Sequence, residues 1–276
     1  MIPAGTGDIP ANSEQLAEAI HAGMQSVLQA SAGDVHVDCA LESPADISHL
    51  GIRLAGVELA GAPLNAPKDV NVLGAARIGE LTIDGVPVLV HGAAATLRVQ
   101  VKHCPVNWAR DAKGRTWLTL SADAGGEPAP SGEFSFETTM PALQQAVHEL
   151  ANDAATRAGA KLRDLKFRLT QTGERSLRLE ADAAASKFMM TAQVAAIAEI
   201  SLDDAMVLTI NDLELHGRNS PGQMVVGTLG DQLVRRWKGQ RIDLAQYAIS
   251  GARLTGATLQ LEPVVRITAQ INPATA

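Results

Sequence analysis

The stretch LKFRLTQTGERSLRL, residues 165–179, shows most clearly the alternation from which the fold is predicted. Every second residue from Leu165 to Leu169 is apolar, and the alternation resumes at Leu177 after a turn at Gly173. A period of two places the apolar side chains on one face of a strand, and a glycine turn between two such runs predicts a hairpin. The stretch therefore predicts an amphipathic antiparallel β-sheet.

The same alternation continues on both sides of this hairpin. It is clear in DVHVDCAL at 34–41, and the dipeptide Asp84-Gly85 predicts a tight turn between two further strands. Because strands follow one another without crossover helices, antiparallel pairing is favoured over a parallel α/β fold. The other predicted strands are 52–59, 78–83, 86–91, 96–101 and 116–122 before the hairpin, and 187–200, 205–215, 241–249, 252–255 and 258–271 after it.

Three segments change to helical spacing and predict amphipathic helices. The first covers 13–30, the second opens at Thr139 with Pro141 in its first turn, and the third opens at Ser220. The predicted fold class is therefore α+β, with long curved antiparallel sheets wrapping amphipathic helices. The apolar stripes are Leu16, Ile20, Met24, Val27 and Leu28; Leu143, Val147 and Leu150; and Val225, Val226, Leu229, Leu233 and Trp237.

The order of these elements predicts two halves, each a helix followed by a meander of strands. We expect a flexible tail at 1–12, a first half at 13–122, a linker at 123–138 and a second half at 139–276, which includes the third helix at about 221–238. Identity between the halves is too low to establish a duplication, so one continuous domain is the alternative.

Composition limits the classes of partner. The net charge is −7 with no basic run, so a nucleic-acid backbone would be repelled. No apolar stretch approaches the ~20 residues that span a bilayer, and the first ten residues lack the regions of a signal peptide. We expect a soluble protein, cytoplasmic or peripheral to a membrane, or one of the cell envelope if a leader was removed.

Residues typical of catalytic and metal sites are scattered. Cys39 and Cys104 are too few for a disulfide framework, which leaves buried free thiols or a single bridge. The seven histidines form no metal-binding spacing, and the adjacent His103 and Cys104 would point to opposite faces of a strand. The sequence predicts no enzyme, cofactor or metal, although an enzyme of unrecognised type stays an alternative.

The tail RIDLAQYAISGARLTGATLQLEPVVRITAQI, residues 241–271, resembles the end of LmeA-like phospholipid-binding proteins, which have a tubular lipid-binding (TULIP) architecture. The matched features are Ile242, Asp243 and Leu244 after a helix, then a glycine turn at Gly251 or Gly256 and amphipathic strands. Coverage extends from about 13 to 272. The resemblance implies a bacterial envelope protein whose long helix lies in a wrapped sheet and leaves a groove for acyl chains.

That resemblance implies which side chains would bind the ligand. The apolar groove would be lined by Leu143, Val147, Leu150, Met189, Met190, Val226, Leu229, Leu233 and Trp237. The same stripes are also compatible with ordinary core packing. The basic group Arg235, Arg236, Lys238 and Arg241 would contact a lipid head group or membrane surface, or would instead complement the dipole of the third helix.

The functional hypothesis from the sequence is a non-catalytic carrier or sensor in lipid transport. It would hold phospholipid or fatty acyl chains in an elongated groove, since each methylene removed from water contributes roughly 0.8 kcal/mol. The alternative is a structural or assembly protein that joins a larger complex through sheet edges and apolar surfaces.

Overall fold

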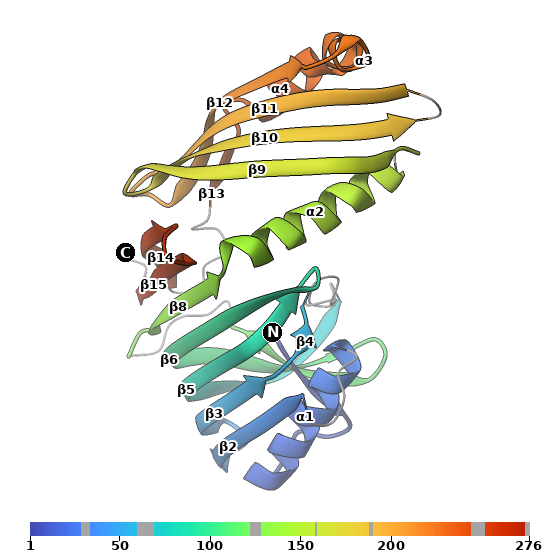
Figure 1. Cartoon of the computed structure of the whole chain (residues 1–276). Coiled ribbons are helices and arrows are strands. Elements are labelled where there is room, and N and C mark those ends of the chain that lie inside the picture. Colours follow the sequence, from blue (N-terminus) through green and yellow to red (C-terminus); the bar gives the residue numbers. More distant parts are fainter. Residues whose placement is uncertain are drawn as a thin grey trace. The chain divides into compact units, whose positions relative to one another are not determined.

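A computed structural model describes residues 1–28, 34–59, 69–121, 128–157, 159–187, 190–243 and 252–273. The fold is mixed α+β, dominated by large antiparallel sheets with few helices, as the sequence predicts (Figure 1). The chain divides into two compact units. Unit 1 comprises 1–137, 246–256 and 268–276, and unit 2 comprises 138–245 and 257–267.

The first sheet has ten strands, in the order β14-β15-β8-β6-β5-β3-β2, with β7 pairing with β6 and β1, and β4 with β5. The pairs β1–β7, β2–β3, β5–β6 and β6–β7 are antiparallel, whereas β5 runs parallel to β3 and β4. The strands are β1 (Ile2–Thr6), β2 (Val35–Ser43), β3 (Asp46–Leu54), β4 (Val57–Glu58), β5 (Val70–Val90), β6 (Ala93–Asp111), β7 (Arg115–Leu120), β8 (Ser131–Thr138), β14 (Ala252–Gln260) and β15 (Val265–Pro273).

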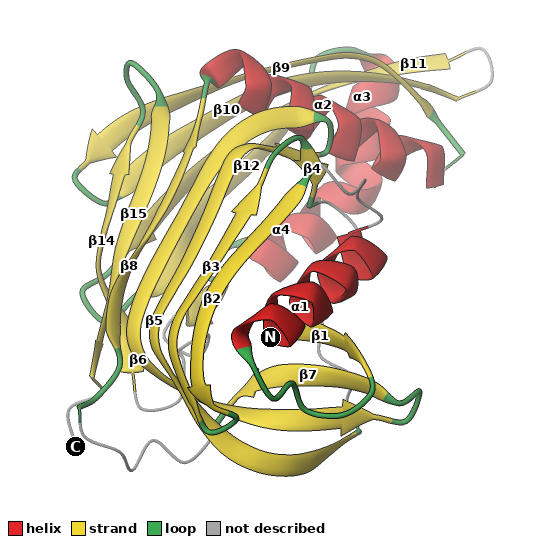
Figure 2. Cartoon of the chain, turned by 90° about the horizontal axis from the view of Figure 1, so that it is seen from below, coloured by secondary structure: helices red, strands yellow, loops and turns green. Residues whose placement is uncertain are grey.

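Helix α1 (Ser13–Leu28) covers the inner face of this sheet and closes the core of unit 1. It packs on β1 and β2, as Figure 2 shows. Leu16 and Ile20 are both fully buried, among strand residues that include Ile52, Ile78 and Trp108. The prediction of an amphipathic helix here is confirmed, and its apolar stripe is sealed against the sheet.

Unit 2 contains a five-stranded antiparallel sheet in the order β13-β12-β11-β10-β9. Helix α2 (Met140–Arg157) lies along β9, and α3 (Ser220–Val225), a π-helical turn (Val226–Gly230) and α4 (Asp231–Trp237) pack on β11 and β12. The predicted second and third helices are confirmed, with the π turn interrupting the third. The strands are β9 (Lys161–Gly173), β10 (Ser176–Lys187), β11 (Met190–Leu202), β12 (Val207–Gly217) and β13 (Arg241–Asp243).

Two segments expected to be irregular are strands instead. The predicted tail contains β1, which pairs with β7 and buries Ile2 and Ala4. Residues 131–138 of the predicted linker form β8. In both cases a short run gains its hydrogen bonds from a partner distant in the sequence, so local composition is a weak guide.

The turn predicted at Asp84-Gly85 is wrong. Strand β5 continues through both residues, and a Cβ at Gly85 would collide with the side chain of Val88, beside a shift in the β5–β6 register. This glycine therefore allows close packing at a bulge. The hairpin closes at His91 and Gly92, both with positive φ, whose N–H groups donate to the Glu58 carboxylate at 3.0 Å.

Candidate functional site: an open apolar face in unit 2

The register of the unit 2 sheet separates its side chains into one apolar and one charged face. Phe167 lies opposite Ala181, Ala181 opposite Ala196, and Ala196 opposite Leu215, and directly opposed residues share a face. The charged face carries Arg178, Glu180 and Glu199. The apolar face consists of Leu165, Phe167, Leu169, Leu177, Leu179, Ala181, Ala183, Val194, Ala196, Ala198, Ile200, Ile210, Leu213 and Leu215.

This apolar face is not closed in the way that the core of unit 1 is. Of its residues only Ala198 is buried, and the others are partly exposed. Helix α2 packs chiefly on β9, at one edge of the sheet. Its own stripe is also incomplete, since Ala146 is buried whereas Leu150 is 44% exposed. Unit 2 therefore has an amphipathic sheet whose apolar side is only partly covered.

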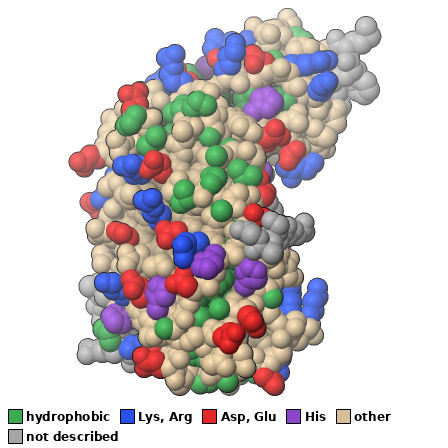
Figure 3. Space-filling model, turned by 60° about the horizontal axis from the view of Figure 1, so that its bottom comes forward, with side chains coloured by type: hydrophobic (Ala, Val, Ile, Leu, Met, Phe, Trp, Pro, Cys, Tyr) green, Lys and Arg blue, Asp and Glu red, His purple; other side chains and the backbone are tan. Residues whose placement is uncertain are grey.

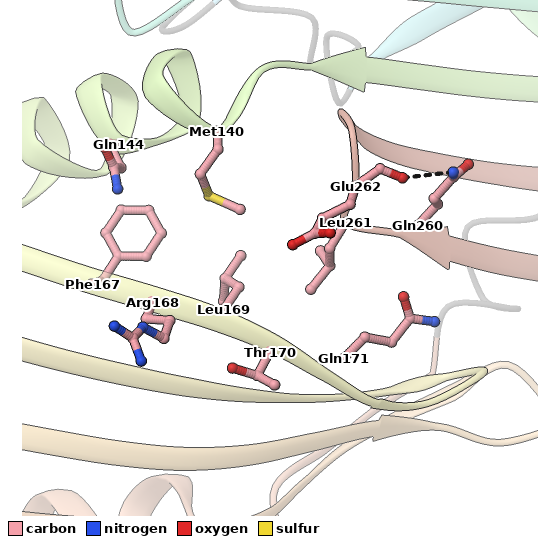
Figure 4. A pocket seen from close by; sticks show the side chains of 10 residues that line it. All are labelled: Met140, Gln144, Phe167, Arg168, Leu169, Thr170, Gln171, Gln260, Leu261 and Glu262. Carbon is pink, nitrogen blue, oxygen red and sulfur yellow. Dashed lines mark hydrogen bonds between the residues drawn. The ribbon is translucent and has the colours of Figure 1, made fainter.

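A cavity of about 760 Å³ lies where α2 begins, beside β9 and the connection between β14 and β15. This volume is within the roughly 300–1,000 Å³ of known ligand pockets. Figure 4 shows Met140, Phe167, Leu169 and Leu261 extending toward one another around this space. The cavity is continuous with the apolar face of the sheet, because Phe167 and Leu169 belong to both.

Polar groups lie at one end of the cavity, near Gln260 and Glu262. Gln171 Nε2 donates to the carbonyl of Leu259 at 3.2 Å, and Gln260 Nε2 donates to the carbonyl of Glu262 at 2.7 Å. Figure 4 shows the Glu262 carboxylate extending into the space beside Leu261. Six of the ten lining residues are polar or charged and exposed, so the site is an open hollow with one apolar wall formed by Met140, Phe167, Leu169 and Leu261.

The structure brings together only part of the predicted groove. The cavity is lined from α2 by Met140 and Gln144, rather than by the predicted Leu143, Val147 and Leu150. Sequence reasoning missed Met140 and Leu261, which are single apolar residues at the ends of elements. Phe167 and Leu169 had a signal, because they belong to the alternation that predicts the strand.

The other predicted lining residues lie elsewhere or outside the description. Met190, at the start of β11, is 60% exposed. Val226 is partly buried in the π turn, and Trp237 ends α4. Met189 lies outside the described residues, as do Leu244 and Gly251 of the tail motif and the side chains of Leu229 and Leu233. None of the nine residues predicted to line the groove is among the described residues that line the cavity.

The predicted basic group divides into paired and exposed cations. Lys238 Nζ lies 2.7 Å from Asp212 Oδ1, and this hydrogen bond lowers the pKa of Asp212 and raises the pKa of Lys238. Arg241 lies 3.8 Å from Asp203. By contrast, Arg235 is exposed, and the exposed Arg236 stacks on the ring of Trp237 at 5.7 Å.

Exposed apolar side chains accompany these two arginines on the same helical segment. Met224 is 69% exposed at the end of α3, Val225 follows it, and Trp237 is 38% exposed at the end of α4. Apolar side chains next to arginines are typical of helices that lie on a membrane surface. Within the described residues, no helix is both long and apolar enough to cross a membrane.

Polar clusters in unit 1 have structural explanations. The Asp111 carboxylate accepts hydrogen bonds from Lys113 N, Arg115 N, Arg115 Nε and Trp117 Nε1 at 2.7–3.2 Å. Burial of Asp111 opposes its ionisation, but these bonds outweigh burial and lower its pKa. They join the turn after β6 to β7.

Neither cysteine of unit 1 is suited to nucleophilic chemistry. Burial raises the pKa of the Cys104 thiol to about 11. Burial and the nearby Asp38 raise the pKa of Cys39, whose Sγ lies 3.1 Å from the carbonyl of Ser13. Both are free thiols in the structure, and the thiolate, which is the reactive form, is disfavoured in each.

The outer face of the first sheet carries an exposed ionic cluster. His49 Nε2 lies 2.9 Å from Asp38, and His49 Nδ1 lies 4.0 Å from Glu80. In the part of the chain that the structure describes, no three His, Cys, Asp or Glu side chains gather in a group able to hold a metal. Figure 3 shows charges of both signs and histidines interspersed on the face that it draws.

Comparisons with protein-family models, with curated proteins and with solved structures gave no match to this chain.

Proposed function

We propose that this protein binds an amphiphile with a long apolar chain, such as a phospholipid or fatty acyl compound, and acts as a non-catalytic carrier or sensor. The observation that carries this proposal is the partly exposed apolar face of the unit 2 sheet, which leads into a cavity of about 760 Å³. An alkyl chain placed there would cover apolar groups that otherwise contact water. A TULIP-like relationship stays part of the proposal.

The helices of the two units differ in how far they bury their apolar stripes. This difference supports the view that the exposed apolar face of unit 2 binds a ligand and is not merely poorly packed. Helix α1 buries Leu16 and Ile20 completely against its sheet, so this chain contains the elements of a sealed helix-on-sheet core. Helix α2 is slightly longer than α1, yet it lies along β9 and leaves Leu150 exposed. Exposed contiguous apolar surface in a folded protein usually marks a binding site.

The alternative of assembly through a sheet edge receives less support. Strand β9 is an edge of the unit 2 sheet and carries charged side chains that include Lys161, Arg163 and Lys166. Charges on an edge strand oppose pairing with the edge of another chain. Assembly through the apolar face or through another sheet edge, such as β2, stays an alternative, and the experiments below separate it from ligand binding.

The first experiment is native mass spectrometry of the purified full chain. A co-purifying amphiphile on a single chain supports the proposal. A ligand-free oligomer supports assembly, provided that a separate hydrogen-exchange measurement shows protection of the strands that carry the apolar face. That result would refute the proposal that the protein is a carrier.

The second experiment measures binding of straight-chain alcohols with eight, ten and twelve carbons by displacement of a fluorescent apolar probe. Each buried methylene contributes about 0.8 kcal/mol, so the Kd should fall about fourfold for each added carbon. Leu169→Asn, in the cavity wall, should weaken binding of the twelve-carbon alcohol about tenfold or more.

The matched control for that variant is Leu120→Asn. Leu120 is a 40% exposed leucine in β7 and does not line the cavity, so its replacement should leave the Kd unchanged. Equal effects of the two substitutions, or a Kd that does not depend on chain length, would contradict binding in this cavity.

A further inference from the structure

The polar end of the unit 2 cavity presents hydrogen-bond acceptors to a ligand. The amide nitrogens of Gln171 and Gln260 are both engaged by backbone carbonyls, those of Leu259 and Glu262. Each amide nitrogen keeps a second N–H that can donate, and each Oε1 can accept, so both side chains offer an acceptor beside a remaining donor. The acceptors come from β9 and from β14.

Glu262 adds a negative charge at the same end. Figure 4 shows its carboxylate directed into the space beside Leu261. The carboxylate makes no hydrogen bond or ion pair with any residue that the structure describes. An ionised carboxylate accepts strong hydrogen bonds from cationic donors and repels anions.

Arg168 is the one cation among the described lining residues. Figure 4 shows its side chain on the opposite side of β9 from Phe167 and Leu169, and it forms no ion pair with Glu262. Gln144, at the α2 side beside Phe167, is a neutral amide able to donate or accept. The net charge of the whole chain is also −7.

From these groups we infer that the ligand of this cavity is an amphiphile with a hydrogen-bond-donating, cationic head, such as a primary ammonium attached to an alkyl chain. Its chain lies against Met140, Phe167 and Leu169, and its head donates to Glu262 and to the carbonyl oxygen of Gln171 or Gln260. This inference rests on the proposed function and narrows its ligand class, because the Glu262 carboxylate would repel the carboxylate head of a free fatty acid.

The test compares three probes with the same chain and different heads: dodecylammonium, dodecanol and dodecanoate. Their affinities for the full chain are measured by displacement of a neutral fluorescent probe, below the micelle concentration and at two salt concentrations. Dodecylammonium should bind at least tenfold more tightly than dodecanoate, with dodecanol between them. Higher salt should reduce the difference, because it screens the charge at Glu262.

The substitution Glu262→Gln tests whether Glu262 causes the preference for dodecylammonium, because it removes the negative charge and keeps the size of the side chain. Because Glu262 is exposed, the variant should bind dodecylammonium up to about fivefold more weakly. It should keep its affinity for dodecanol and bind the ammonium and carboxylate probes within about threefold of each other. The matched control is Glu14→Gln, an exposed glutamate in the first turn of α1 in unit 1 that does not line the cavity, and it should behave as the unchanged chain.

The two ideas fail in different ways. If none of the three probes binds, the proposed function is wrong. If dodecanol binds but dodecanoate binds as tightly as dodecylammonium, or Glu262→Gln leaves the preference intact, the cavity is an apolar site and only the inferred head group is wrong.

Discussion

Replacing one leucine by alanine on each of two helices tests whether α2 leaves its sheet open. Leu16 in α1 is 0% exposed and Leu150 in α2 is 44% exposed. Truncating a fully buried leucine removes its transfer free energy and leaves a cavity, so Leu16→Ala should cost about 3–5 kcal/mol of unfolding free energy. Leu150 keeps nearly half its surface in water, and its truncation opens no closed space, so Leu150→Ala should cost about 1 kcal/mol.

Urea unfolding of the full chain, followed by far-UV circular dichroism and by tryptophan fluorescence, measures both values. Trp108 and Trp117 are buried in unit 1, so fluorescence follows chiefly the unit that contains Leu16, whereas circular dichroism follows both units. An apolar probe should still bind the Leu150→Ala variant. If Leu150→Ala costs as much as Leu16→Ala, then α2 is sealed on its sheet and the argument for an open apolar face is wrong.

Three further outcomes are expected from the charged and thiol groups. Asp111→Asn should lower stability by roughly 2–3 kcal/mol at pH 7 because it weakens charge-assisted hydrogen bonds. The pKa of Asp111 is lower in the folded state than in the unfolded state, where it is near 4. The stabilisation by Asp111 is therefore fully present above the unfolded pKa and is lost as the pH falls through the folded-state pKa. The urea midpoints of the unchanged protein and the variant should converge near pH 2. Cys104 should react with a thiol reagent at pH 8 only as fast as unit 1 opens, and a rate near that of a free thiol would contradict its burial. We also expect Arg235→Gln with Arg236→Gln to weaken binding to vesicles rich in anionic lipid about thirtyfold, at about 1 kcal/mol per charge, while Lys113→Gln in a turn of unit 1 has no effect.

Periodicity along the sequence was enough to predict the helices and most strands. The spacing of Leu16 and Ile20 and the alternation from Leu165 onward each express a local geometry, and the structure has a helix and a strand there. Pairing was harder to predict, because it depends on distant partners. Ile2–Thr6 shows no alternation and becomes a strand only through β7, and Asp84-Gly85 resembles a turn although it lies within β5.

The site was only partly predictable for a related reason. An apolar stripe shows which side of a helix is apolar, but it does not show how much of that side a sheet covers. The stripes of α1 and α2 therefore predict the same packing, although the structure buries the stripe of α1 and leaves that of α2 partly exposed. The polar end was beyond prediction, since Gln171, Gln260 and Glu262 come from segments about ninety residues apart that meet through the Gln171–Leu259 hydrogen bond.

The pairing of β1 with β7 has a consequence for how the protein is made. Ile2 lies opposite Leu118, so a segment that leaves the ribosome early has no strand partner until β7 has also emerged. At roughly 5–20 residues per second, that delay is on the order of 10 s, during which α1 is the packing partner that β1 can reach. Translation halted before Arg115 would therefore leave β1 without its strand partner in the sheet.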